Sequence, residues 1–119
     1  MAERYVPARG DFVTIDCDPQ AGHEQAGRRP ALVLTPAFYN RASGLAIMCP
    51  VTSQVKGYPY EVQISEGLRI QGVILADHAR SVDWTARQAA FVDKAPLGVL
   101  STVLSQLGSL LGIIRPPAA

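Results

Sequence analysis

Short apolar segments, separated by glycine, proline and polar residues, constrain this chain to a small β domain. The segments lie at residues 12–17, 30–35, 45–51, 60–64, 72–76 and 88–92. Each has the length of one strand, and the residues between them favour turns. The pattern predicts six short strands in a mostly antiparallel, barrel-like sheet.

The period of the apolar residues changes after Pro96. A stripe with spacings of 3, 4, 3 and 4 is formed by Leu97, Leu100, Leu104, Leu107 and Leu111, and is widened by Val99, Val103 and Leu110. This spacing predicts a C-terminal helix that packs on the barrel, with part of its face open to another subunit. Residues 36–41 are expected to form one helical turn after Pro36.

Length and composition fit one soluble domain. The chain has 119 residues, of which 48% are hydrophobic and 18% charged. We expect a single domain over residues 1–114 and a disordered Pro/Ala tail over 115–119. No apolar run approaches the ~20 residues that span a bilayer, and the N-terminus has no secretory pattern, so a cytoplasmic location is predicted. The net charge of +1 requires any nucleic-acid binding to depend on local clusters.

The strand predicted at 12–17 has one apolar face, formed by Val13, Ile15 and Cys17, which is expected to point inward. Cys17 and Cys49 show no metal-binding spacing, and a reducing compartment disfavours a disulfide between them. Both cysteines are therefore expected to be small buried hydrophobes. Neither a metal site nor a cofactor is predicted.

Two polar loops, 18–29 and 52–59, flank strongly apolar segments. If the first three strands are neighbours, the loops meet and form one groove lined by Glu24, Arg28, Arg29, Thr52, Ser53, Gln54 and Lys56. Guanidinium forks, an ammonium group and hydroxyls suit a phosphodiester. Two other readings remain open: Arg29 could be a surface residue at a strand entrance, and Glu24 could pair with Arg28.

The order and spacing of several motifs resemble those of the MazF/PemK family of toxin endoribonucleases from toxin–antitoxin pairs, and are close to the enterobacterial MazF type. The matching pieces include Arg4-Tyr5-Val6-Pro7, Gly10-Asp11, Asp18-Pro19, Glu24-Gln25-Ala26-Gly27, Arg29-Pro30-Ala31-Leu32-Val33-Leu34, Tyr39-Asn40, Pro50-Val51-Thr52-Ser53, Lys56-Gly57-Tyr58-Pro59, Leu75-Ala76-Asp77, Trp84 and Arg87. The resemblance runs from about Tyr5 to Gly112.

This resemblance implies an SH3-like barrel homodimer that cuts single-stranded RNA, often mRNA, at short sequence motifs without a metal. The substrate's 2′-hydroxyl attacks, leaving a 2′,3′-cyclic phosphate and a 5′-hydroxyl. A small antitoxin with an acidic, flexible tail is the implied partner. By motif, Arg29 and Thr52 are the catalytic pair, and Glu24 is a further candidate for proton transfer. The implied RNA contacts are Gln25, Arg28, Asn40, Ser53, Gln54 and Lys56.

The chemistry of the residues can be compared with that mechanism. Arg29 suits the stabilisation of charge on a five-coordinate phosphorus, but a guanidinium keeps its proton at neutral pH and is a poor general base. The base therefore stays open, with Glu24 as a candidate. The two histidines do not suggest an RNase A-like dyad; His23 is a weak candidate for a substrate contact, and His78 is expected at the surface or hydrogen-bonded.

Two other classes of function share the general fold. A CcdB-like toxin would act by binding a protein such as gyrase, without catalysis. An inert SH3-like module would bind RNA without cutting it. The stretch from Gln25 to Pro30 favours the nuclease over the CcdB-like toxin, and the inert module would be recognised by the absence of cyclic-phosphate ends.

Overall fold

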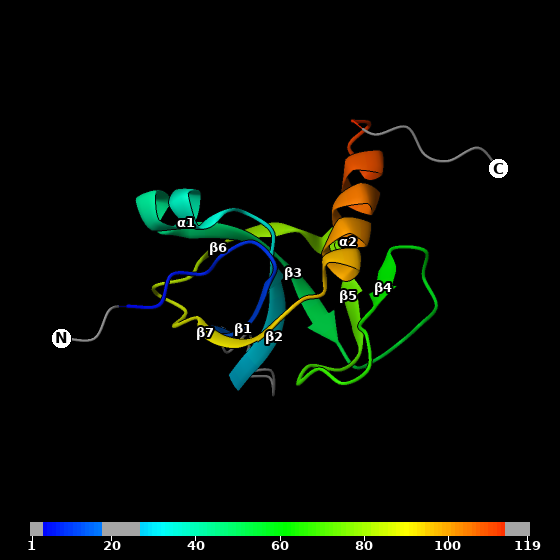
Figure 1. Cartoon of the computed structure of the whole chain (residues 1–119), viewed down its shortest axis with the longest axis horizontal. Coiled ribbons are helices and arrows are strands. Elements are labelled where there is room, and N and C mark those ends of the chain that lie inside the picture. The colour runs from blue at the N-terminus through cyan, green and yellow to red at the C-terminus, as the bar shows by residue number, and fades with distance from the viewer. Residues whose placement is uncertain (1–3, 18–26, 114–119) are drawn as a thin grey trace.

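The computed structural model describes residues 4–17 and 27–113. Seven strands, two α-helices and one 3₁₀ turn follow one another along this part of the chain (Figure 1). They are β1 (Asp11–Cys17), β2 (Gly27–Val33), α1 (Ala37–Ser43), β3 (Leu45–Thr52), β4 (Glu61–Gln63), β5 (Val73–Leu75), η2 (Ala76–His78), β6 (Arg80–Asp83), β7 (Ala90–Lys94) and α2 (Leu97–Leu110).

The described strands form one antiparallel sheet in the order β4-β5-β3-β2-β1-β7. The eight-residue strand β3 changes partners along its length, because its first half pairs with β6 and its last two residues pair with β5. The predicted mostly antiparallel β domain with a C-terminal helix is confirmed, although the sheet is not closed. The predicted neighbourhood of the first three strands is also confirmed.

Residues on β1 supply two separate hydrophobic clusters. Phe12 belongs to a cluster beneath α2, while Val13 and Ile15 belong to a second cluster with Met48 and Trp84. Successive side chains of a strand point to opposite faces, so a strand buried on both faces contributes to both clusters. The prediction of a single inward face was therefore too narrow. Cys49 is buried as expected, whereas Cys17 is only partly buried.

Helix α2 stands beside β4 and β5 (Figure 1), and its middle covers the first cluster. Val99, Leu100 and Val103 are buried there, with further leucines partly buried. Leu97, by contrast, is 80% exposed, and Leu111 is 63% exposed. The predicted packing of the leucine stripe on the sheet is thus correct in the centre, whereas Leu97 and Leu111 at the two ends are left exposed.

Strand β6 was not predicted, because residues 77–84 mix turn-forming residues with only two large apolar ones, Val82 and Trp84. Arg80–Asp83 nevertheless pairs with the first half of β3, with Val82 buried. The last strand begins at Ala90, two residues later than predicted. The delay has a local cause: Gln88 has a φ of 53°, a left-handed conformation that belongs to a turn and not to a strand.

Asn40 is fully buried and ties α1 to the domain. Its side-chain amide donates to the carbonyl oxygens of Pro7, at 2.7 Å, and Thr35, at 2.9 Å. Its Oδ1 accepts from the Thr35 hydroxyl, and its backbone oxygen accepts from Trp84 Nε1. The predicted contact between Asn40 and RNA does not fit these interactions, because no part of this side chain reaches the surface.

Candidate active site

Arg29 and Thr52 lie across from each other on adjacent strands. Ala31 of β2 pairs with Pro50 of β3, and continuing this antiparallel register by two residues places Arg29 opposite Thr52. Both residues line the same cavity, of about 230 Å³. The sheet therefore brings together the two residues that the motifs assign to catalysis.

The cavity opens at the edge of the second hydrophobic cluster. Its inner wall is apolar and includes Ile15, Ala31, Met48 and Val82. Arg29, Thr52, Cys17 and Arg80 also line it. The cavity thus combines cations and a hydroxyl with an apolar wall, a combination suited to a phosphate that carries a flat organic group.

Arg80 is a second cation in this cavity, and it was not among the predicted site residues. The alternation of residues 80, 82 and 84 indicates where its side chain lies: Val82 and Trp84 are both buried in the second cluster, and Arg80 precedes Val82 by two residues. The period of two in a strand puts Arg80 on that same inward-facing side. Because β6 was not predicted, the inward position of Arg80 was not predicted either.

Arg28 points to the other face of β2 from Arg29. Its Nη1 lies 2.7 Å from Asp16 Oδ1, and its Nη2 donates to the backbone oxygens of Thr14, at 2.7 Å, and Gln88, at 2.6 Å. Its Nε donates to the Thr14 hydroxyl. The guanidinium therefore joins β1, β2 and the turn before β7, and its predicted contact to substrate would have to compete with these partners.

The end of β3 is fixed by a close backbone approach. Gly72 has a φ of 117°, and a Cβ at this position would overlap the backbone carbonyl oxygen of Thr52. Thr52 Oγ1 accepts a hydrogen bond from the Gln54 N–H at 3.1 Å. Glycine at position 72 thus allows the loop before β5 to lie directly against the candidate catalytic threonine.

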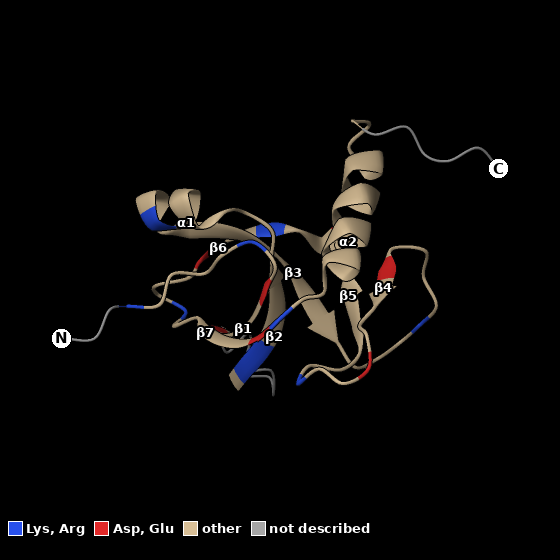
Figure 2. Cartoon of the chain, in the orientation of Figure 1, with Lys and Arg blue, Asp and Glu red and all other residues tan. Residues whose placement is uncertain are grey.

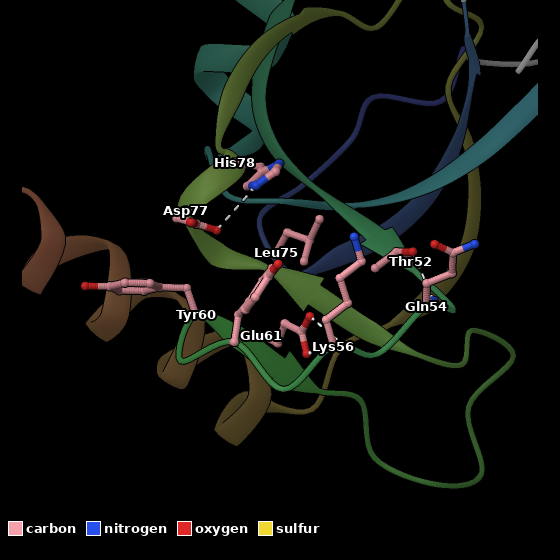
Figure 3. Close-up of a pocket in the computed structure, with 9 residues that line it drawn as sticks. Thr52, Gln54, Lys56, Tyr60, Glu61, Leu75, Asp77 and His78 are labelled. Atoms are coloured by element: carbon pink, nitrogen blue, oxygen red, sulfur yellow. Dashed lines mark hydrogen bonds and ion pairs between the residues drawn. The ribbon is translucent and has the colours of Figure 1, made fainter. Parts of the chain in front are cut away.

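The loop after Thr52 is folded around a carboxylate. Glu61 accepts the backbone N–H groups of Lys56, at 3.1 Å, and Gly57, at 2.9 Å. Ser53, Gln54 and Lys56 are exposed. In Figure 3 the Lys56 amino group reaches toward Thr52, whereas the Gln54 side chain extends away from the other labelled residues. Of this loop, Lys56 is therefore the residue best placed to act with Thr52.

Thr52 also lines a second cavity, of about 150 Å³, on the β4–β5 side of β3. We call it the β4–β5 pocket, and its lining residues are Thr52, Gln54, Lys56, Tyr58, Tyr60, Glu61, Leu75, Asp77 and His78. His78 is exposed, and its Nε2 lies 3.7 Å from Asp77 Oδ1, which agrees with its predicted surface position. Thr52 is the residue that the two cavities share.

Three residues predicted to act at the site, Glu24, Gln25 and His23, lie outside the described residues. Cys49 is an internal thiol: burial, together with the Asp77 carboxylate, raises its pKa to about 12, so it is not a nucleophile at neutral pH. In the described ranges 4–17 and 27–113, no three histidine, cysteine, aspartate or glutamate residues are grouped to hold a metal ion.

Figure 2 shows how the charges are distributed: a broad blue stretch for lysine and arginine lies at the lower end of β2, the strand of Arg28 and Arg29, and smaller blue stretches are spread over other elements. Acidic residues are dispersed among several elements. Within the described part of the chain, no helix has the length and apolarity required to cross a membrane.

Comparisons with known proteins agree with this geometry. The model of the family described as "PemK-like, MazF-like toxin of type II toxin-antitoxin system" matches residues 8–111. The chain is 43% identical to the endoribonuclease toxin MazF of Escherichia coli K12 over 112 residues, covering 94% of this chain and all of that protein. It is 35% identical to the Escherichia coli endoribonuclease PemK, over 87% of this chain and 80% of PemK.

Among solved structures, a MazE–MazF crystal structure from Deinococcus radiodurans superposes with a TM-score of 0.88 and 55% identity, covering 92% of this chain and 99% of that one. A MazF structure from the same organism gives a TM-score of 0.83 at 56% identity, with the same coverage. The family match spans both strands that carry Arg29 and Thr52. The chain therefore belongs to the PemK-like, MazF-like toxins of type II toxin–antitoxin systems.

Proposed function

We propose that this chain is the toxin of a type II pair and cuts single-stranded RNA, including mRNA, at short sequence motifs in the cytoplasm. The observation that carries the proposal is the shared cavity of Arg29 and Thr52, in a chain whose relatives are named endoribonucleases. The proposed reaction uses the substrate's own 2′-hydroxyl as nucleophile and assigns no step to a metal or a cofactor.

In the proposed reaction, the 2′-hydroxyl of one ribose attacks the adjacent phosphorus. The new P–O2′ bond closes a 2′,3′-cyclic phosphate as the P–O5′ bond breaks, and the departing 5′-oxygen takes a proton from water to become a 5′-hydroxyl. Negative charge grows on the non-bridging oxygens, where the guanidinium of Arg29 stabilises it. The Thr52 hydroxyl, which accepts from Gln54, can still donate its own proton to such an oxygen.

Arg80 and Lys56 are assigned by the cavities that they share with Thr52, and Glu24 and Gln25 by the family motifs alone. Arg80 and Lys56 add positive charge near the phosphate, and Ser53, Gln54 and Gln25 are proposed substrate contacts. Glu24 is the proposed group for removing the proton from the 2′-hydroxyl, because a guanidinium keeps its proton at neutral pH. Arg28 acts on the substrate through its charge, since its guanidinium nitrogens already donate within the protein.

Two partners are part of the proposal. The first is a small antitoxin whose acidic, flexible tail lies over Arg29, Arg80 and Lys56 and competes with RNA; a MazE–MazF complex is known for a relative 55% identical. The second is another copy of the chain, since Leu97, Leu110 and Leu111 are exposed on α2 and at its end. Light scattering at micromolar concentration should give the mass of a dimer, and a monomer would contradict this part.

The test is cleavage of a long single-stranded RNA in the presence of EDTA. Discrete products ending in 2′,3′-cyclic phosphate and 5′-hydroxyl are expected. A matched oligonucleotide with 2′-deoxyribose only at the mapped cleavage site should bind but not be cut, because the nucleophile is missing. Cleavage of that oligonucleotide, or a requirement for a divalent metal, would contradict the mechanism.

A CcdB-like function remains the alternative class. The family match over residues 8–111 does not favour it. Growth inhibition that survives Arg29→Ala while cellular RNA stays intact would support a protein-binding toxin instead.

A further inference from the structure

The β4–β5 pocket differs in chemistry from the cavity that holds Arg29. The arginine cavity has two guanidinium groups and no carboxylate among its lining residues, whereas the β4–β5 pocket has two carboxylates, from Glu61 and Asp77, and one lysine. Two carboxylates make the β4–β5 pocket a poor site for a second phosphate. The two cavities meet at Thr52, so whatever occupies the pocket lies next to the reacting group.

The two carboxylates are not equally available. Glu61 already accepts backbone N–H groups from Lys56 and Gly57, and therefore holds the loop in shape. The Asp77 side chain is 40% exposed, and His78 is its neighbour at 3.7 Å. Asp77 is thus the carboxylate that can accept hydrogen bonds from a ligand, and Figure 3 shows it with His78 at one end of the pocket.

The rest of the lining suits a flat ring. Leu75 contributes a partly buried apolar surface, and Tyr58 and Tyr60 contribute aromatic ones. Apolar and aromatic surfaces are what unstacked bases pack against in single-stranded RNA complexes, while polar groups read the base edges. A pocket of this kind next to a phosphate-binding cavity fits one nucleobase of the same RNA strand.

We propose that the β4–β5 pocket binds the nucleobase that flanks the scissile phosphate, and that Asp77 selects a base with an exocyclic amino group. This inference rests on the proposed function. An ionised carboxylate only accepts hydrogen bonds, so it pairs with the amino groups of adenine, cytosine or guanine. Uracil instead presents two carbonyl oxygens beside a single N–H, and those oxygens are repelled. His78 lines the pocket beside Asp77, with its Nε2 3.7 Å from Asp77 Oδ1, beyond hydrogen-bond distance but close enough to affect the base edge that meets the carboxylate.

The experiment compares the wild-type protein with Asp77→Asn on an RNA library randomised around one cleavage motif, with sequencing of the product ends. Wild-type protein should disfavour uracil at one position next to the cut. Asp77→Asn removes the negative charge and replaces one of the two acceptor oxygens with an amide donor, which tolerates a uracil carbonyl. Discrimination at that position should therefore fall about tenfold, as for one lost base contact. Preferences at the other positions should stay unchanged.

Glu66→Gln is the matched control, because Glu66 is an exposed carboxylate in the turn after β4 and does not line the pocket. It removes the same charge and should leave the profile intact. His78→Ala should weaken discrimination at the same position as Asp77→Asn, by a smaller factor. Thermal unfolding of each variant checks that the domain is folded. An Asp77→Asn profile identical to that of Glu66→Gln would overturn the inference.

A second readout separates this inference from the proposed function. Binding of 2′-deoxy oligonucleotides that differ only at the selected base can be measured by fluorescence anisotropy without cleavage. If the wild-type protein cuts no RNA, the nuclease proposal fails, while base-dependent binding that disappears in Asp77→Asn still supports the pocket. Cleavage with equal binding of all four bases by wild type and Asp77→Asn overturns the pocket alone.

Discussion

The two faces of β2 use neighbouring arginines in opposite ways. Arg29 pairs across the sheet with Ile15 and lines the cavity that contains Thr52. Arg28 pairs with Asp16 and donates to acceptors from β1 and from the turn before β7. Both residues are arginines, and they are adjacent in the strand. The face of β2 on which each one lies therefore determines that Arg29 lines a cavity and that Arg28 joins segments of the protein.

The largest difference between the two faces should appear in catalysis. Arg29→Ala should reduce the rate of RNA cleavage by about 10²–10³, the usual cost of removing one group that stabilises transition-state charge. Its stability should change little, within about 0.5 kcal/mol, because the side chain is exposed. Single-turnover cleavage and urea unfolding measure the two effects. A variant that cuts as fast as the parent would remove Arg29 from the mechanism.

Thr52, the other member of the pair, can be displaced by a substitution at Gly72, which lies against its backbone. Gly72→Ala should lower activity about tenfold or more and destabilise the domain by about 1–3 kcal/mol, since a Cβ there overlaps the Thr52 carbonyl. Gly67→Ala is the control: its φ of 90° imposes a similar backbone strain, but nothing lies within 4 Å of the new Cβ. Equal effects from the two substitutions would show that strain, and not displacement of Thr52, is responsible.

Arg28→Met should have the opposite balance of effects from Arg29→Ala, with the larger loss in stability and the smaller loss in activity. It removes an ion pair and two hydrogen bonds to backbone oxygens, and should lower the free energy of unfolding by about 1 kcal/mol, because solvent screens this half-exposed group. Cleavage should fall less than tenfold. Arg28→Lys keeps the charge but cannot reach all these acceptors, so it should recover activity more fully than stability. A loss of activity as large as that of Arg29→Ala would contradict the division between the faces.

The smallest expected effect comes from labelling the two cysteines, of which Cys17 lines the cavity of Arg29 and Thr52. Cys17 lines it and is partly buried, whereas Cys49 is fully buried with a pKa raised to about 12. At pH 8 a maleimide should therefore modify Cys17 first, because the reactive thiolate of Cys49 is scarce and inaccessible. Modification at Cys17 should slow cleavage by obstructing the cavity, and Cys17→Ser should be insensitive. Peptide mass spectrometry identifies the labelled residue.

Most of the fold could be predicted from the periodicity of the apolar residues and the positions of the turn residues. Apolar runs bounded by turn residues located six of the described strands, and the leucine spacing located α2. Strand β6 was missed because its four residues contain one buried apolar side chain, too few to show a period of two. The partner change along β3 and the open edge of the sheet depend on tertiary pairing that local patterns do not encode.

The candidate site was predicted in part, for similar reasons. Strand adjacency was enough to bring Arg29 and Thr52 together once the apolar runs were recognised. Polarity could not show that Asn40 is buried with its hydrogen bonds satisfied, or that Arg28 faces Asp16. Both residues are polar near a predicted groove, and only the fold distinguishes a side chain that supports the domain from one that meets a ligand.

The backbone contact between Gly72 and Thr52 also bears on how this domain can be engineered. Residues 65–71 look like an ordinary surface connection and an obvious place to graft a peptide or a reporter. Because this connection ends against the candidate catalytic threonine, tension placed on it would be transmitted to the RNA-cutting groups. The stretch suits a ligand-controlled switch, whereas a passive tag belongs at the α1–β3 junction, where Gly44 has open space around it.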